Sequence, residues 1–135
     1  MQDHPTYDEL LAAIERFLDE EIVPNTPGGH AFHARVAANA IRTVRRELAA
    51  QDDVLAAEWG GLDALLGATE RPAGREALRK AIVERNAELC ELIRGGDADA
   101  EPFAEQVREH LRNTVRDKLR VSNPRWLAET HDTTH

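Results

Sequence analysis

The chain has 135 residues and a formal net charge of −8, with 41% hydrophobic and 31% charged residues. This length suits one domain with a core of its own, and the many Ala, Leu, Glu and Arg residues are typical of a helical protein. The acidic charge argues against nucleic acid and anionic membranes as main partners, because both attract clustered cations. A single cysteine excludes an internal disulfide, and no leader or apolar run of about 18 residues is found, so we expect a cytoplasmic protein without a membrane partner.

The N-terminal part predicts two helices. Thr6 and Glu9 fit a capping box, and the apolar spacing that follows predicts a helix over residues 7–22. The prolines and glycines of VPNTPGG predict that a loop ends it. A second helix is expected over residues 31–50, with an apolar face made of Val36, Ala37, Ala40, Ile41, Val44 and Leu48.

Three further helices are expected downstream. A short one over residues 54–66 would begin at Asp52 or Asp53 and be interrupted by the Gly60–Gly61 pair. A longer one over residues 75–94 would end at two glycines, with Cys90 as a small core residue at the edge of its apolar stripe. The last would have Pro102 in its first turn and end at Pro124, and it would bury Phe103, Val107, Leu111, Val115 and Leu119.

The predicted fold is all-α. We expect one domain over residues 1–127, an antiparallel helical bundle of four long helices plus one short helix, followed by a flexible tail over residues 128–135. No segment alternates as a strand would.

Arginines form two rows in this acidic chain. One row follows the helix predicted over residues 31–50, with Arg35, Arg42 and Arg46, and the other comprises Arg108, Arg112, Arg116 and Arg120 near the C-terminus. Such rows are either solvated faces paired with neighbouring acids or sites for an anionic ligand or an acidic partner, which the forked guanidinium suits well. The sequence leaves both interpretations open.

Other polar residues also have two interpretations. The helical spacing places His33 in the apolar face, where it is either a buried, hydrogen-bonded histidine or part of a ligand site. Asn39 and Asn86 lie inside helices, where each could bridge to a neighbouring helix or serve a site. Histidine pairs occur at His30 with His33 and at His131 with His135, but nothing completes a ligand set, so no metal site is predicted.

The stretch NPRW, residues 123–126, contributes Arg125 and Trp126. Trp126 either folds back on the bundle or anchors an interface, because Trp and Arg dominate binding hot spots. No phosphate loop, nucleophile elbow or kinase motif is present, so no catalytic residue and no cofactor is predicted.

Four stretches resemble a known family: PTYDELLAAIERFLDEEIVP, FHARVAANAIRTVRRELA, RNAELCELIRGG and HLRNTVRDKLRVSNPRWL. Over residues 5–127 the chain is similar to the small bacterial helical proteins classed as DUF6285. Such proteins are typically encoded beside an aminoglycoside-phosphotransferase-like kinase and an acyl-CoA dehydrogenase. A similar protein acts with the kinase of levulinate-type catabolism that phosphorylates a 4-hydroxyacyl-CoA.

The resemblance implies a non-catalytic accessory subunit that binds such a kinase and possesses no cofactor of its own. The alternatives are a stand-alone module that binds an anionic acyl or acyl-CoA ligand, with His33 and Arg35 in its pocket, or a structural homodimer. The candidate ligand or partner residues are His33, Arg35, Asn39, Arg42, Arg46, Asn86, Arg112, Arg116, Arg125 and Trp126.

Overall fold

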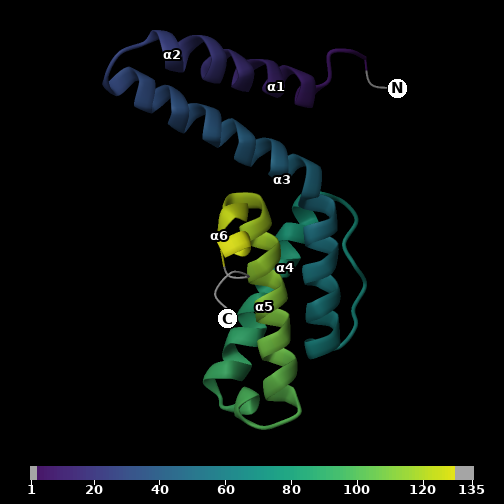
Figure 1. Cartoon of the computed structure of the whole chain (residues 1–135). Coiled ribbons are helices and arrows are strands. Elements are labelled where there is room, and N and C mark those ends of the chain that lie inside the picture. Colours follow the sequence, from purple (N-terminus) through teal and green to yellow (C-terminus); the bar gives the residue numbers. More distant parts are fainter. Residues whose placement is uncertain (1–2, 130–135) are drawn as a thin grey trace. The chain divides into compact units, whose positions relative to one another are not determined.

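The computed structural model describes residues 3–129, and every regular element in that range is helical. The all-α class is therefore confirmed. The helices of the described residues group into two compact units, unit 1 up to residue 49 and unit 2 from residue 50. The longest helix, α3 (Gly29–Leu66), contributes its first half to unit 1 and its second half to unit 2 (Figure 1). In the part of the chain that the structure describes, no helix combines the length and the apolar character needed to cross a bilayer.

Unit 1 begins with one helical run in three pieces, α1 (Tyr7–Phe17), the π-helical η1 (Leu18–Ile22) and α2 (Val23–Asn25). The capping box is formed as predicted, because the Thr6 hydroxyl accepts from the Glu9 N–H and the Glu9 carboxylate accepts from the Thr6 N–H. The run extends three residues beyond the predicted end. Pro24 is tolerated there because it lies in the first turn of α2, where its missing N–H is not needed.

The run α1–α2 and the first half of α3 form an antiparallel hairpin, as the pairs Asp8 with Arg45 and Asp19 with Arg42 show. The hairpin is closed by small side chains, because its buried residues are the alanines 31, 34 and 38. These lie at helical spacing and let two helices approach closely. The face predicted to be buried is exposed at Val36 and Val44 and only partly buried at Ile41 and Leu48, since it is rotated about the helix axis from the alanine stripe.

The two helices predicted over residues 31–50 and 54–66 are one continuous helix of 38 residues. The expected break is wrong because the segment contains no proline, and Asp52 pairs with Arg75 (Nε to Oδ1, 2.9 Å) instead of capping a new helix. The Gly60–Gly61 pair lies inside the helix without interrupting it. Glycine weakens a helix but does not forbid it.

Unit 2 adds α4 (Arg75–Arg94), the 3₁₀ turn η2 (Asp97–Asp99), α5 (Phe103–Ser122) and α6 (Pro124–Glu129). The bounds of α4 are those predicted, and Gly96 takes the left-handed conformation (φ 86°) that ends it. Pro124 ends α5 as expected but also begins α6, which the sequence did not predict. Residues 128 and 129 belong to α6, and the rest of the predicted tail lies outside the described residues.

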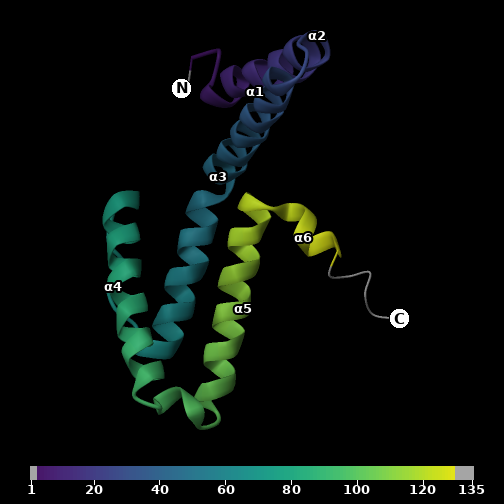
Figure 2. The ribbon, with the colours of Figure 1, turned by 90° about the vertical axis from the view of Figure 1, so that its left-hand side faces the viewer.

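The core of unit 2 is shared by three helices, which Figure 2 shows side by side. Its buried members are Leu55, Trp59, Leu62, Leu78, Ile82, Leu89 and Val107. Contacts between side chains give the helix directions. Asp52 meets Arg75 and Glu58 meets Asn86, so α3 and α4 run parallel. Glu58 lies near Lys118 and Gly61 lies against His110, so α5 runs antiparallel to α3. The connection over residues 67–74 makes the parallel pair possible by returning along α3 (Figure 1). The sequential helices α3 and α4 are therefore parallel, whereas the predicted bundle has antiparallel helices.

The buried face of α5 is rotated from the predicted one. Ala104, Val107 and His110 are buried, while Leu111 and Val115 are exposed. A row of fourth residues turns by about 40° at each step, so its later members leave the contact side of a straight helix. Cys90 on α4 is likewise exposed and is not the core residue that was predicted.

Candidate functional site

One face of α3 in unit 1 carries most of the candidate residues from the first arginine row. Its members recur at i, i+3, i+4, i+7, i+11 and i+14, and we call them the α3 docking face: Phe32, Arg35, Val36, Asn39, Thr43 and Arg46. Phe32 is 60% exposed and Val36 is 51% exposed, and Arg35 and Asn39 are exposed as well. The face therefore combines large apolar groups with a cation, a composition that is common at binding surfaces.

His33 is exposed, which corrects its predicted place in a buried apolar face. Its ring meets the ring of Phe32 edge to face, with 5.6 Å between the centroids. The correction has the same cause as the exposure of Val36, because the hairpin buries the alanine stripe instead. His33 lies at the border of the α3 docking face, next to Phe32 in the chain.

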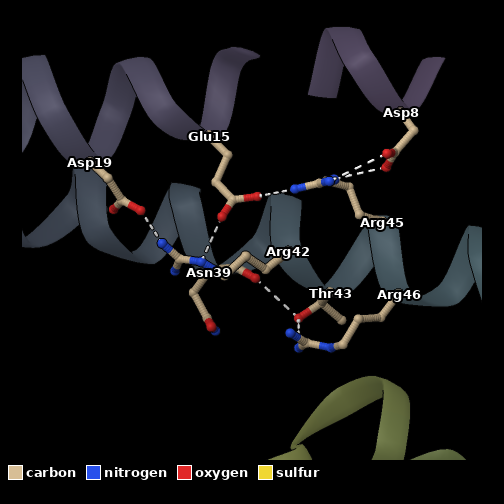
Figure 3. Close-up of polar contacts among 8 residues, drawn as sticks. All are labelled: Asp8, Glu15, Asp19, Asn39, Arg42, Thr43, Arg45 and Arg46. Atoms are coloured by element: carbon tan, nitrogen blue, oxygen red, sulfur yellow. Dashed lines mark hydrogen bonds and ion pairs between the residues drawn. The ribbon is translucent and has the colours of Figure 1, made fainter. Parts of the chain in front are cut away.

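Acids of α1 and η1 neutralise Arg42 of the first arginine row and its neighbour Arg45 (Figure 3). The Arg42 Nε lies 2.8 Å from the Glu15 carboxylate, and the Arg42 Nη2 pairs with the Asp19 carboxylate. Arg45 bridges Asp8 and Glu15 at 2.8 Å each, and its hydrogen bond lowers the pKa of the Asp8 carboxyl. Internal pairing thus accounts for Arg42, which leaves it a weaker candidate for an external anion than Arg35.

The remaining members of the α3 docking face are held differently. Arg46 donates to the Thr43 hydroxyl at 3.2 Å, and that hydroxyl donates to the carbonyl of Asn39 at 3.1 Å (Figure 3). Within residues 3–129, the side chain of Arg35 makes no hydrogen bond or ion pair. The Arg35 guanidinium is therefore available to a partner.

The second arginine row, on α5, is also partly neutralised. Arg108 donates to Glu101 at 2.5 Å and to Glu105 at 2.9 Å, which raises its pKa and lowers that of Glu105. Arg112 reaches Glu105 at 3.4 Å. Arg116 differs, because its hydrogen bond goes to the neutral side chain of Asn113 at 3.2 Å.

Asn86 forms a bridge between helices, which is the structural role that the sequence allowed for it. Its amide donates to the buried carboxylate of Glu58 at 2.9 Å, and the ammonium of Lys118 lies 3.7 Å from the same oxygen. This cluster joins α4, α3 and α5. Because Asn86 belongs to unit 2, it takes no part in the α3 docking face.

A buried cation, Arg85, ties α4 to the end of α3. Arg85 pairs with Asp63, donates to the Gly67 carbonyl at 2.6 Å, and lies over the Trp59 ring with 4.7 Å to its centroid. The pair lowers the pKa of the Asp63 carboxyl. Favourable contact of a cation with the carbonyls at a helix C-terminus explains why a charge is buried here.

Unit 2 contains a cavity that sequence reasoning missed. It has a volume of about 510 Å³ and lies between the second half of α3 and α5, where the buried His110 and Glu58 contribute to its lining. The signal that could have found it is the small-residue spacing of Ala57, Gly61 and Ala64, which leaves room beside a helix. No sequence pattern distinguishes such spacing from ordinary close packing.

The last candidates lie at the end of unit 2. Trp126 is 61% exposed, so it does not fold back into the core, and Arg125 makes no polar contact within the described residues. The same part of the chain holds no group of three or more metal-ligating side chains, and the His131–His135 pair lies outside it.

Comparison with known proteins gives one match. A family model described as a domain of unknown function (DUF6285) covers residues 24–126, so α1 and η1 precede the matched region. No curated protein and no solved structure matches the chain.

Proposed function

The chain belongs to the DUF6285 family, and we propose that it is a non-catalytic accessory subunit of an aminoglycoside-phosphotransferase-like kinase that acts on hydroxyacyl-CoA substrates in the cytoplasm. In this proposal the kinase supplies the ATP and Mg²⁺ sites, since phosphoryl transfer depends on positioned metal and phosphate clamps. The small chain supplies a rigid helical surface that completes the active kinase.

The observation that carries the proposal is the exposure of the α3 docking face. Phe32 and Val36 lie one turn apart on a helix and remain at least half exposed, although burial of such side chains is the main source of stability in water. An amphipathic helix with anchors at this spacing typically fits an apolar groove on a partner. These residues belong to FHARVAAN, which lies inside the region matched by the family model.

Electrostatics favours an acidic rim around that groove. Arg35 projects from the same face without a carboxylate partner among residues 3–129. A guanidinium at the edge of an apolar contact binds a carboxylate in a defined orientation and accelerates association. Arg112, Arg125 and Trp126 of unit 2 stay predictions as further contacts with the kinase.

The experiment is co-expression with the phosphotransferase-like kinase encoded beside this chain, followed by size exclusion and measurement of ATP consumption on hydroxyacyl-CoA. We expect a complex that turns over only when both chains are present. Val36→Glu should weaken the complex at least about tenfold, because it places a charge in the centre of an apolar contact. Arg35→Ala should slow association and make it less sensitive to salt.

Val83→Glu is the matched control. Val83 is also an exposed valine on a helix, 69% exposed on α4, but it lies outside the α3 docking face. Both variants should melt close to the wild-type temperature, since exposed substitutions rarely change stability by more than about 0.5 kcal/mol. Equal loss of binding in the two variants, or full kinase activity without this chain, would contradict the proposal.

The same preparation separates the alternatives. Calorimetry of the isolated chain with acyl-CoA tests the stand-alone binding module, which requires binding in the absence of the kinase. Light scattering of the isolated chain tests the homodimer, which requires a measured mass of twice the monomer. In that case Val36→Glu should lower the measured mass, whereas Val83→Glu should leave it unchanged.

A further inference from the structure

Unit 1 has an uncovered apolar face on one side of its hairpin. On α1 this face consists of four large side chains that are each about half exposed, and on α3 it includes Val44, which is 44% exposed. We call the surface the hairpin apolar face: Tyr7, Leu10, Ile14 and Phe17 of α1, with Ala37, Ile41, Val44 and Leu48 of α3. Its α3 residues are among those that the sequence predicted to be buried.

An ion pair shows that the two parts of this face lie on the same side of the hairpin. Ile14 directly precedes Glu15 on α1, and Val44 directly precedes Arg45 on α3. Glu15 and Arg45 pair at 2.8 Å, so each marks the side of its helix that faces the other helix (Figure 3). One residue turns about 100° about a helix axis, and in two antiparallel helices equal turns in the same sense lead to the same side of the pair. The same order recurs at Tyr7 before Asp8 and at Ile41 before Arg42.

The α3 docking face lies on the other side of α3. Arg35 and Asn39 directly follow the buried Ala34 and Ala38, so they are turned in the opposite sense from the side that faces α1. The long helix therefore carries two separate exposed faces in unit 1, and a partner on one of them leaves the other accessible.

Charge separates the two faces by the kind of partner that each fits. A two-fold interface brings the same patch of both copies together. On the α3 docking face a second copy would place two Arg35 cations in one interface, and like charges at an interface weaken association. The hairpin apolar face contains no charged side chain, so a second copy meets no such repulsion there.

The exposed area is sufficient for a specific but weak dimer. A half-exposed side chain of the size of Phe17 or Tyr7 offers on the order of 100 Å². Five such side chains on each of two copies bring together about 1,000 Å², which is near the lower limit for a specific interface. Residues 130–135, with the sequence THDTTH, contain no apolar side chain that could cover the face instead.

We propose that the hairpin apolar face packs against the same face of a second copy of this chain. Each copy contributes two antiparallel helices, so the interface is a four-helix bundle made from α1 and the first half of α3 of both copies. The bundle buries the large side chains of unit 1, which one hairpin alone leaves exposed. The α3 docking face remains accessible on both copies, so the dimer does not depend on the kinase proposed above.

The first test is light scattering of the isolated full-length chain across the micromolar range. We expect the measured mass to rise from one chain towards two as the concentration increases, because an interface of this area gives micromolar affinity. Val44→Glu should raise the dissociation constant at least about tenfold, since it places a charge inside an apolar contact.

Val36→Glu is the matched control, because Val36 is an exposed valine of the same helix that belongs to the α3 docking face. This variant should dimerise as the wild type does. At concentrations where the wild type is monomeric, both variants should melt close to the wild-type temperature, since both positions are exposed.

A second readout requires no substitution. Tyr7 is the only tyrosine of the chain, so labelling with 3-fluorotyrosine gives one fluorine resonance at the hairpin apolar face. We expect this resonance to shift with concentration and to yield the dissociation constant measured by scattering. A monomer at every concentration, a dimer in which the Tyr7 resonance does not move, or a dimer that Val36→Glu weakens as much as Val44→Glu would overturn the inference. None of these measurements involves the kinase, so failure of the kinase complex leaves them unaffected.

Discussion

His110 shows how a single side chain can link packing to protonation. The residue is buried against Gly61 of the neighbouring helix, and burial lowers the pKa of its imidazole. In the unfolded chain the same group titrates near its ordinary value of 6.5. Below that pH the unfolded state binds a proton that the folded state does not, so protonation favours unfolding.

We therefore expect the free energy of unfolding to be level above about pH 7 and to fall as the pH is lowered through 6.5. Denaturant titrations at a series of pH values measure this slope. His110→Gln removes the titrating group and should flatten the dependence in this window, while all other histidines are kept. An unchanged slope in the variant would show that other groups cause it.

The candidate residues differ in how well the sequence could place them. Asn86 and Glu58 meet across two helices, and that contact depends on the parallel pairing of α3 and α4, which no local pattern encodes. His33 fell in an apolar face by its spacing, yet it is exposed because the hairpin closes on alanines. Chemical type was readable from the sequence, whereas the surroundings of each side chain were not.

At the scale of elements, α3 is the main departure from expectation. Two local signals for a break, an aspartate pair and a glycine pair, are overridden within a helix of 38 residues. Both glycines lie in that helix, but their surroundings differ. A Cβ at Gly60 would meet nothing within 4 Å, whereas one at Gly61 would meet the His110 ring.

The two glycines should respond oppositely to the same substitution. Gly60→Ala should stabilise the protein by about 0.5–1 kcal/mol, because alanine loses less backbone freedom in a helix. Gly61→Ala should destabilise it by about 1–3 kcal/mol, since the added methyl group overpacks a filled contact. Thermal melts of both variants measure the difference.

A second substitution identifies the cause. In a His110→Ala background the methyl group at residue 61 has room, so most of the loss caused by Gly61→Ala should disappear. An equal loss in both backgrounds would mean that the glycine is required for a reason other than the imidazole.

At the scale of the whole molecule, the two units differ in how much apolar surface they bury. Unit 2 contains the cluster of seven buried apolar residues from three helices. The buried residues of unit 1 are three alanines, and the large apolar side chains of α1, Tyr7, Leu10, Ile14 and Phe17, are each about half exposed. Stability should therefore reside mainly in unit 2.

A chain of residues 50–129 should fold by itself, with a cooperative thermal transition and high helicity by circular dichroism. A chain of residues 1–49 should be largely unfolded in isolation, because a two-helix hairpin whose fully buried residues are all alanines does not offset the entropy lost on ordering. Loss of cooperative unfolding in the 50–129 chain would show that its core depends on unit 1.

The sequence by itself determined the all-α class, the capping box at Thr6 and both ends of α4, because capping and helical periodicity are local properties of a few neighbouring residues. It also determined the family. Only the tertiary structure decided that α3 is continuous, that α4 runs parallel to it, and that Ala31, Ala34 and Ala38 are buried instead of Val36. These outcomes depend on contacts between residues far apart in the chain, since the side of a helix that is buried is set by the surface that packs against it.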